Sequence, residues 1–135
     1  MVVARTLFAG GILAGEVAEW VWEHARDRII AYQEPPKTLE ELRQAMANPK
    51  PGYDGHHLNE RTPALRDGYD KALVDGPDNM VLIPTYRHWQ ITGWYATPNP
   101  EFGGLSPREF LRGQSWETRR AVGLKALRDF GALKP

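Results

Sequence analysis

Pairs of closely spaced prolines stop regular structure at three places in this chain, and so confine it to short elements. They stand at Pro35–Pro36, at Pro49 and Pro51, and at Pro98 and Pro100. Proline lacks a backbone N–H and disfavours the helical conformation in the residue before it, so helices and inner strands end there. The pattern between these stops predicts a helix-rich α+β fold with one small pair of strands.

The size and composition allow one domain, residues 1–135, with a hydrophobic core of its own. A compact domain of this length buries roughly two-thirds of the surface of its unfolded chain. Five tryptophans, five tyrosines and four phenylalanines supply large apolar groups, and there is no cysteine. Disulfides and thiolate zinc sites are therefore excluded, and any metal must be bound through nitrogen and oxygen.

Helical segments are expected on both sides of a central region, over residues 5–47 and 105–131. Apolar residues recur at helical spacing from Leu7 to Tyr32, which predicts one long helix. A capping box beginning at Thr38 starts a second helix that runs to about Met46. Ser106–Pro107 and Ser115 are typical helix starts, and Gly131 is a typical helix end.

The apolar stretch Val2–Gly15 is too short for a membrane span, because a bilayer core needs about 20 apolar residues. Arg5 interrupts it, and Glu16 and Glu19 follow it. We expect no membrane span here but the buried start of an amphipathic helix. The alternative is a fragment of a longer export or translocation segment.

Three of the four histidines fall in the central region. His56 and His57 end a predicted strand, and Asn59–Pro77 has so little periodicity that it indicates a long surface loop. Met80–Ile83 is a short apolar strand preceded by Asn79. Thr85–Tyr95 follows as a helix that carries His88. The fourth histidine, His24, is expected to be a packing or surface residue.

Hydrolysis of a phosphodiester needs a water molecule that loses its proton and positive charge near the oxygens that become negative. A neutral imidazole can take that proton near pH 7, since its ordinary pKa is about 6.5. A divalent ion can supply the charge. Two adjacent histidines, His56 and His57, can divide these tasks between them.

The run Tyr53–Asp54–Gly55–His56–His57, the Asp78–Asn79 pair and the later His88 resemble the HNH nucleases, most closely those of bacterial toxins. The resemblance covers about residues 52–95 and implies a ββα-metal finger. It implies that His56 and His88 bind the metal and that His57 is the general base. It also implies that Asn79 orients His57 by accepting a hydrogen bond from it.

One position departs from the family. Toxin-type HNH sites have a further histidine one helical turn after the position of His88, where this chain has Thr92. Water, substrate phosphate or an oxygen donor would complete the metal shell, with Glu60 the first candidate and Asp54 or Asp78 as alternatives. Fewer nitrogen ligands favour Mg²⁺ or Mn²⁺ over Zn²⁺ or Ni²⁺.

The resemblance implies a metal-dependent DNA endonuclease, secreted or delivered by contact as an antibacterial toxin domain, with an immunity protein as partner. The alternatives are an RNase, a phage- or restriction-type nuclease, and a non-catalytic, metal-stabilised module that binds nucleic acid or protein. The formal net charge is zero, but residues 105–135 carry seven basic and three acidic groups. That segment is the predicted phosphate-binding surface. The candidate arginines are Arg87, Arg108, Arg112, Arg119 and Arg120.

Overall fold

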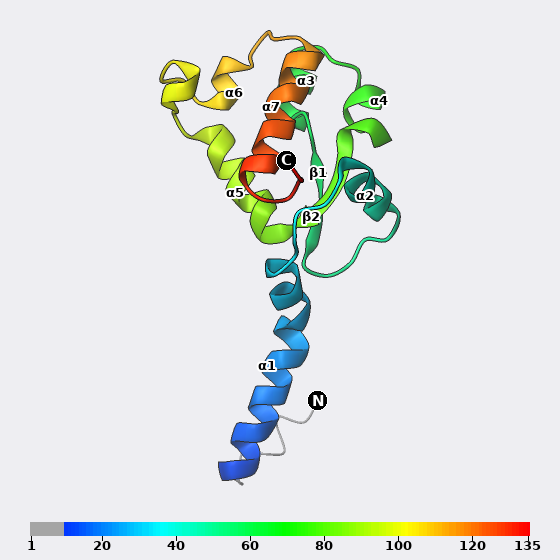
Figure 1. Ribbon diagram of the computed structural model, residues 1–135, viewed down its shortest axis with the longest axis vertical. Helices are drawn as coiled ribbons and strands as arrows, with labels where there is room; N and C mark the ends of the chain where they lie inside the picture. The colour runs from blue at the N-terminus through cyan, green and yellow to red at the C-terminus, as the bar shows by residue number, and fades with distance from the viewer. Residues whose placement is uncertain (1–9) are drawn as a thin grey trace.

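The protein is a helix-rich α+β domain with a two-stranded sheet, and one long helix extends from it (Figure 1). The computed structural model describes residues 10–135, with side chains from 16 to 23 and from 25 to 135. The predicted fold class is thus confirmed at the level of a helix-rich α+β domain. The expected burial of the stretch Val2–Gly15 and the expectation for the His24 side chain lie outside the described residues.

The predicted long helix is present as α1 (Gly10–Tyr32). It touches the body near its C-terminal end, where Ala31 is 2% exposed. Gly52 fits closely there, because a Cβ on it would lie 2.9 Å from the carbonyl oxygen of Asp27. The predicted apolar face does not pack on the body, since Val17 and Val21 are exposed. Within the described residues, no helix has the length and apolar character that crossing a bilayer requires.

A tight capping arrangement starts the next element, α2 (Leu39–Gln44), which continues as the 3₁₀ turn η2 (Ala45–Ala47). The Thr38 hydroxyl accepts the Glu41 N–H, and the Glu41 carboxylate accepts the Thr38 N–H. Leu42 is buried and helps to cover the sheet. The predicted capping box is confirmed, because it depends on local geometry alone.

The sheet consists of β1 (Tyr53–His57) and β2 (Met80–Pro84), paired antiparallel. Tyr53 lies opposite Pro84 and His57 opposite Met80. The helix α5 (Thr85–Ala96) begins directly after β2 and packs against both strands. The core below them includes Leu58, Val81, Ile83, Ile91, Tyr95 and Leu127.

The connection between the strands is not the unstructured loop that its sequence suggested. It contains α3 (Arg61–Arg66), α4 (Lys71–Val74) and the 3₁₀ turn η3 (Pro77–Asn79). Asp70 caps α4 by accepting the Ala72 N–H. Helices of four to six residues are shorter than two turns, so they leave no measurable apolar period.

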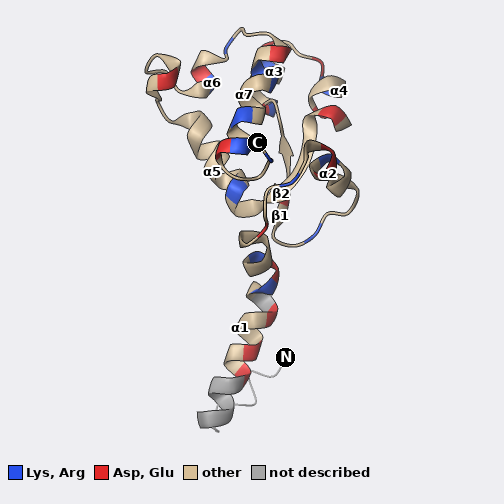
Figure 2. Cartoon of the chain, in the orientation of Figure 1, with Lys and Arg blue, Asp and Glu red and all other residues tan. Residues whose placement is uncertain are grey.

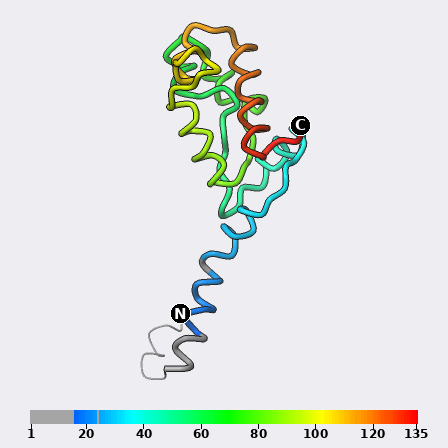
Figure 3. The backbone as a smooth tube through the Cα atoms, turned by 60° about the vertical axis from the view of Figure 1, so that its left-hand side comes forward, coloured from blue at the N-terminus to red at the C-terminus, as the bar shows by residue number. Residues whose placement is uncertain are grey.

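The C-terminal part contains η4 (Pro100–Phe102), α6 (Pro107–Phe110) and α7 (Trp116–Asp129). The predicted caps at Ser106 and Ser115 are confirmed. After α7 the chain returns to the segment that follows α1, where Lys37 and Leu133 form a parallel bridge (Figure 3). This bridge joins the C-terminal end of the chain to the segment between α1 and α2.

Candidate functional site

A pocket of about 410 Å³ lies where the end of β1 meets α3 and α5. All three histidines of the central region line it, together with Glu60, Thr92 and Arg108. The structure therefore brings together residues that stand far apart in the sequence. The sequence resemblance to HNH nucleases singled out the three histidines.

His56 is the most buried of these histidines, at 4% exposed. Its Nε2 atom is buried and has no hydrogen-bond partner among the described residues. Burial, together with smaller contributions from the nearby His88 and His57, lowers the pKa of His56 to about 3. The ring is therefore neutral at pH 7, with a lone pair that the protein itself leaves unused. A neutral imidazole is the form that binds metal ions.

His88 approaches His56 from α5. The two ring centroids lie 5.2 Å apart, and the ring planes are at 74°. Nδ1 of His88 lies 2.9 Å from Oδ2 of Asp54, and the other oxygen of Asp54 accepts the Thr85 hydroxyl at 3.0 Å. Asp54 thus orients the His88 ring through Nδ1. The second nitrogen, Nε2, forms no hydrogen bond within the described part of the chain.

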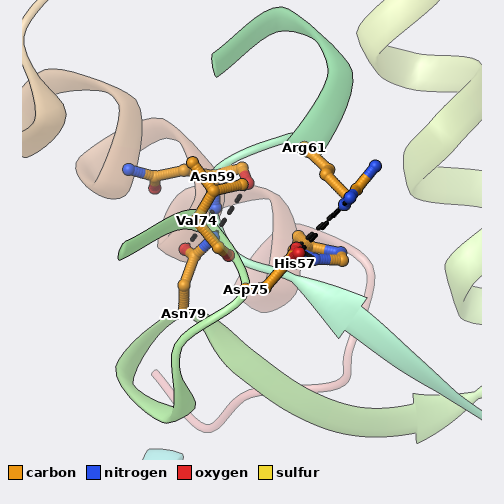
Figure 4. Close-up of polar contacts among 6 residues, drawn as sticks. All are labelled: His57, Asn59, Arg61, Val74, Asp75 and Asn79. Atoms are coloured by element: carbon orange, nitrogen blue, oxygen red, sulfur yellow. Dashed lines mark hydrogen bonds and ion pairs between the residues drawn. The ribbon is translucent and has the colours of Figure 1, made fainter. Parts of the chain in front are cut away.

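His57 is held by a carboxylate. Its Nε2 lies 3.0 Å from Oδ1 of Asp75, and Arg61 donates to the same carboxylate through Nε at 2.9 Å (Figure 4). The pKa of Asp75 is below its ordinary value, first because of the hydrogen bond from Arg61 and then because of the one to His57. A negative charge therefore stays beside the His57 ring.

Asn79 acts on the backbone rather than on the His57 ring. Its Oδ1 accepts the Asn59 N–H at 2.8 Å, and its Nδ2 donates to the carbonyl oxygens of Asn59 at 3.1 Å and Val74 at 2.8 Å (Figure 4). The side chain is 2% exposed. These bonds differ from the expected one to His57. They tie the segment just after His57 to the segment just before Asp75, so Asn79 fixes the distance between those two residues.

Glu60 has a partner already. Its two oxygens accept from Nε of Arg108 at 2.8 Å and from Nη2 of the same residue at 2.6 Å. This pairing raises the pKa of Arg108. In the described part of the chain, no group of three or more His, Asp or Glu side chains is arranged to hold a metal ion. Of the expected ligands, His56 and His88 therefore lie next to each other, whereas Glu60 is paired with Arg108.

Part of the positive charge at the pocket comes from α3, a segment that the charge count did not indicate. Arg61 and Arg66 of α3 line the pocket. By contrast, Arg119 is 3% exposed and forms an ion pair with Asp67, so it supports the fold and is unavailable to phosphate. That expectation was wrong because an arginine count does not reveal which side chains pair internally.

Other arginines proposed from the sequence also have partners. Arg87 donates to Gln90 and lies over the Tyr86 ring. Arg120 donates to the carbonyl oxygen of Asp78. Of the five candidates, Arg108 is the one that reaches the pocket.

No sequence pattern pointed to Asp75 or Arg61, because both lie in the segment that resembled a loop. Asp54 was considered as an oxygen donor to the metal, whereas the structure uses it to orient His88. Thr92 lines the pocket, one helical turn after His88. Thr92, the position at which toxin-type HNH nucleases have a further histidine, therefore lines the same pocket as His56 and His88.

No family model matches the chain, and comparisons with curated proteins and with solved structures give no significant match.

Proposed function

We propose that the protein is a metal-dependent endonuclease whose substrate is DNA. In this proposal β1, β2 and α5 form an HNH-type ββα-metal finger. The main support is the buried, neutral ring of His56, whose Nε2 atom has no hydrogen-bond partner among the described residues. This ring lies next to His88 and in the same pocket as His57. A protein that leaves such an atom unsatisfied loses stability, so the arrangement favours a ligand for it.

His56 and His88 are the residues that would hold the metal. Asp54 supports this role, because a carboxylate on the far nitrogen of a ligating histidine fixes the ring and raises its basicity. When bound, the ion supplies Lewis-acid stabilisation of the leaving oxygen. Two nitrogen ligands leave most of the coordination shell to water and phosphate, which favours Mg²⁺ or Mn²⁺ over Zn²⁺ or Ni²⁺.

His57 is the proposed general base. With Nε2 held by Asp75, Nδ1 is the nitrogen that takes the proton from the attacking water. The Asp75 carboxylate then stabilises the imidazolium that forms, as a charged partner does in other base–carboxylate pairs. Asn79 holds together the segment after His57 and the segment before Asp75. Arg66, which lines the pocket, would face the phosphates, whereas Arg61 is paired with Asp75.

The test is cleavage of supercoiled plasmid with Mg²⁺, Mn²⁺, Ni²⁺ and Zn²⁺ in turn. We expect the wild-type chain to nick plasmid, most actively with Mg²⁺ or Mn²⁺, and His57→Ala to lose nicking while retaining its fold and its metal affinity. His24→Ala, in the middle of α1, is the matched histidine control and should cleave normally. Full cleavage by His57→Ala contradicts the mechanism. Cleavage of total RNA but not of plasmid assigns RNA as the substrate instead.

The remaining alternative is that the metal only stabilises the fold. Removing the ion with a chelator distinguishes this structural role from a catalytic one. The core formed by Leu58, Val81, Ile83 and Tyr95 consists of large side chains that pack against one another. We therefore expect a chelator to abolish cleavage and to change the melting temperature little. A domain that unfolds when the ion is removed would be a metal-stabilised module.

On the sequence resemblance, we also propose that this nuclease is an antibacterial toxin domain that is delivered into target cells. In the producing cell, an immunity protein would inhibit it. Production of the chain in a bacterial cytoplasm should stop growth and fragment the chromosome, whereas His57→Ala should do neither. Normal growth with intact chromosomal DNA at matched protein levels argues against the toxin role.

A further inference from the structure

The helix α1 carries an exposed apolar stripe on the side away from the body. Trp22 is 51% exposed and Ile29 41% exposed, and Ala18 and Ala25 lie on the same face of the helix. The opposite face makes the contact with the body through Ala31, which is 2% exposed. Figure 1 shows the helix extending from the body, so the stripe has no cover from the body. Exposed apolar stripes of this kind mark interaction surfaces.

The spacing of the stripe is that of a coiled-coil seam. Ala18, Trp22, Ala25 and Ile29 follow one another at intervals of four, three and four residues. This is the alternation of heptad positions a and d, which brings two helices together along one line. We propose that α1 pairs antiparallel with α1 of a second copy of this chain.

The sizes of the seam residues select the antiparallel arrangement and its register. Facing layers in an antiparallel pair combine an a position with a d position. Ala18 then faces Ile29 of the second copy, and Trp22 faces Ala25 of the second copy. Each layer combines a small with a large side chain, so the layers have similar widths and can pack densely.

Parallel pairing fits the same seam poorly. It places Trp22 on Trp22 and Ala18 on Ala18, so that a very wide layer adjoins narrow ones. The antiparallel pair also puts the two bodies at opposite ends of the paired helices, where they cannot collide. A pair of this kind is isologous and closes at two copies.

Charge supports the same register. Glu19 and Arg26 are exposed and flank the seam on one side, at the e positions. In the antiparallel pair, Glu19 lies near Arg26 of the second copy, and the reciprocal contact is made by symmetry. Figure 2 shows acidic and basic residues along α1. Opposite charges at flanking positions set the orientation of paired helices.

Sedimentation equilibrium of the full chain over a range of concentrations tests the pairing. We expect a monomer–dimer equilibrium in the wild type. Trp22→Glu should raise the dissociation constant at least about thirtyfold, the loss typical of removing a central aromatic anchor. Ile30→Glu is the matched control, because Ile30 is also 50% exposed on α1 but lies outside the seam, and it should leave the dimer intact.

Charge-reversal variants test the proposed contact between Glu19 and Arg26 of the second copy. Glu19→Arg and Arg26→Glu should each weaken the dimer, and the double variant that exchanges the two charges should recover it. Equal dimerisation by all four proteins rules out the register proposed here.

Cysteine cross-linking tests the orientation, since the natural chain has no cysteine. A mixture of Ala18→Cys and Ile29→Cys proteins should form a mixed disulfide on oxidation, whereas Ala18→Cys alone should not cross-link. Self-cross-linking of Ala18→Cys means parallel pairing and overturns the proposal. A wild type that stays monomeric at all concentrations overturns it too, as does a monomer that binds lipid vesicles through Trp22. None of these outcomes depends on nuclease activity.

Discussion

The ring centroids of His56 and His88 lie 5.2 Å apart because the hairpin register and the start of α5 bring these two residues together. β1 and β2 pair so that His56 is opposite Val81. α5 begins at Thr85, directly after β2. Its first turn therefore places His88 beside Asp54 of β1. Two local features, the strand register and the direct start of α5 after β2, thus bring together the two imidazoles that the proposed metal site requires.

If His56 and His88 bind a metal ion as proposed, a third imidazole in the pocket should change which metal binds most tightly. Thr92 lines the same pocket one turn after His88, so Thr92→His can add a third imidazole. We expect zinc affinity to rise roughly tenfold or more, since soft nitrogen ligands favour Zn²⁺ over Mg²⁺. Isothermal titration with both ions measures the change, with Thr92→Asn as the control. Unchanged zinc affinity in Thr92→His means that His56 and His88 do not hold the ion.

Asp75 should affect turnover more than binding. Asp75→Asn keeps the shape but removes the charge that holds the His57 ring, and losses of such supporting groups typically cost about 10- to 100-fold in activity. We expect kcat to fall within that range, with KM and metal affinity close to wild type. Asp129→Asn, an exposed carboxylate paired with Lys125 far from the pocket, is the control. A normal kcat in Asp75→Asn shows that the His57 ring is positioned by other means.

The parts of the fold set by local chemistry could be predicted from the sequence. The Thr38–Glu41 and Ser106–Glu109 capping boxes and the end of α7 near Gly131 are all present. Each depends on three or four neighbouring residues, so the sequence carries the whole signal. The gathering of His56, His57 and His88 in one pocket also followed from spacing, because a hairpin followed at once by a helix has little freedom.

Interactions between distant segments could not be predicted. Arg119 pairs with Asp67 and Asn79 bonds to Asn59, and neither pairing has a local pattern. The Asp75–His57 contact depends on α4, whose four residues are too few for a periodic signal. The exposure of the α1 stripe was missed for another reason: apolar spacing identifies a face but not what covers it.

Acid should weaken the fold through His56. The ring is buried, and its pKa falls from the ordinary 6.5 to about 3. Below about pH 6.5 the unfolded chain binds a proton that the folded chain does not, so stability is full above this pH and declines as the pH falls towards 3. The slope approaches about 1.4 kcal/mol per pH unit for one proton.

Urea unfolding between pH 7.5 and 4.5, in the presence of a chelator, measures this decline. Carboxylates contribute to acid unfolding as well, so the comparison is with His56→Gln, which cannot take up the proton. The wild type should lose more stability than His56→Gln over this pH range. Parallel curves for the two proteins show that His56 does not account for the decline.

Two helical glycines should respond in opposite ways to the same substitution. Gly123 of α7 packs against the chain just after His57, where an added Cβ would lie 2.2 Å from the carbonyl oxygen of Leu58. Gly93 of α5 is exposed, and an added Cβ there meets nothing within 4 Å. Because both sites are in helices, alanine brings the same gain in helix propensity at each.

We expect Gly123→Ala to lose about 1–3 kcal/mol of stability, since backbone must shift to admit the methyl group. Gly93→Ala should gain up to about 1 kcal/mol. Chemical denaturation of both variants measures the two changes. Gly123→Ala should also lower nuclease activity, because displacing Leu58 moves His57. A stable, fully active Gly123→Ala contradicts the close approach of α7 to the end of β1, and with it the support for the base.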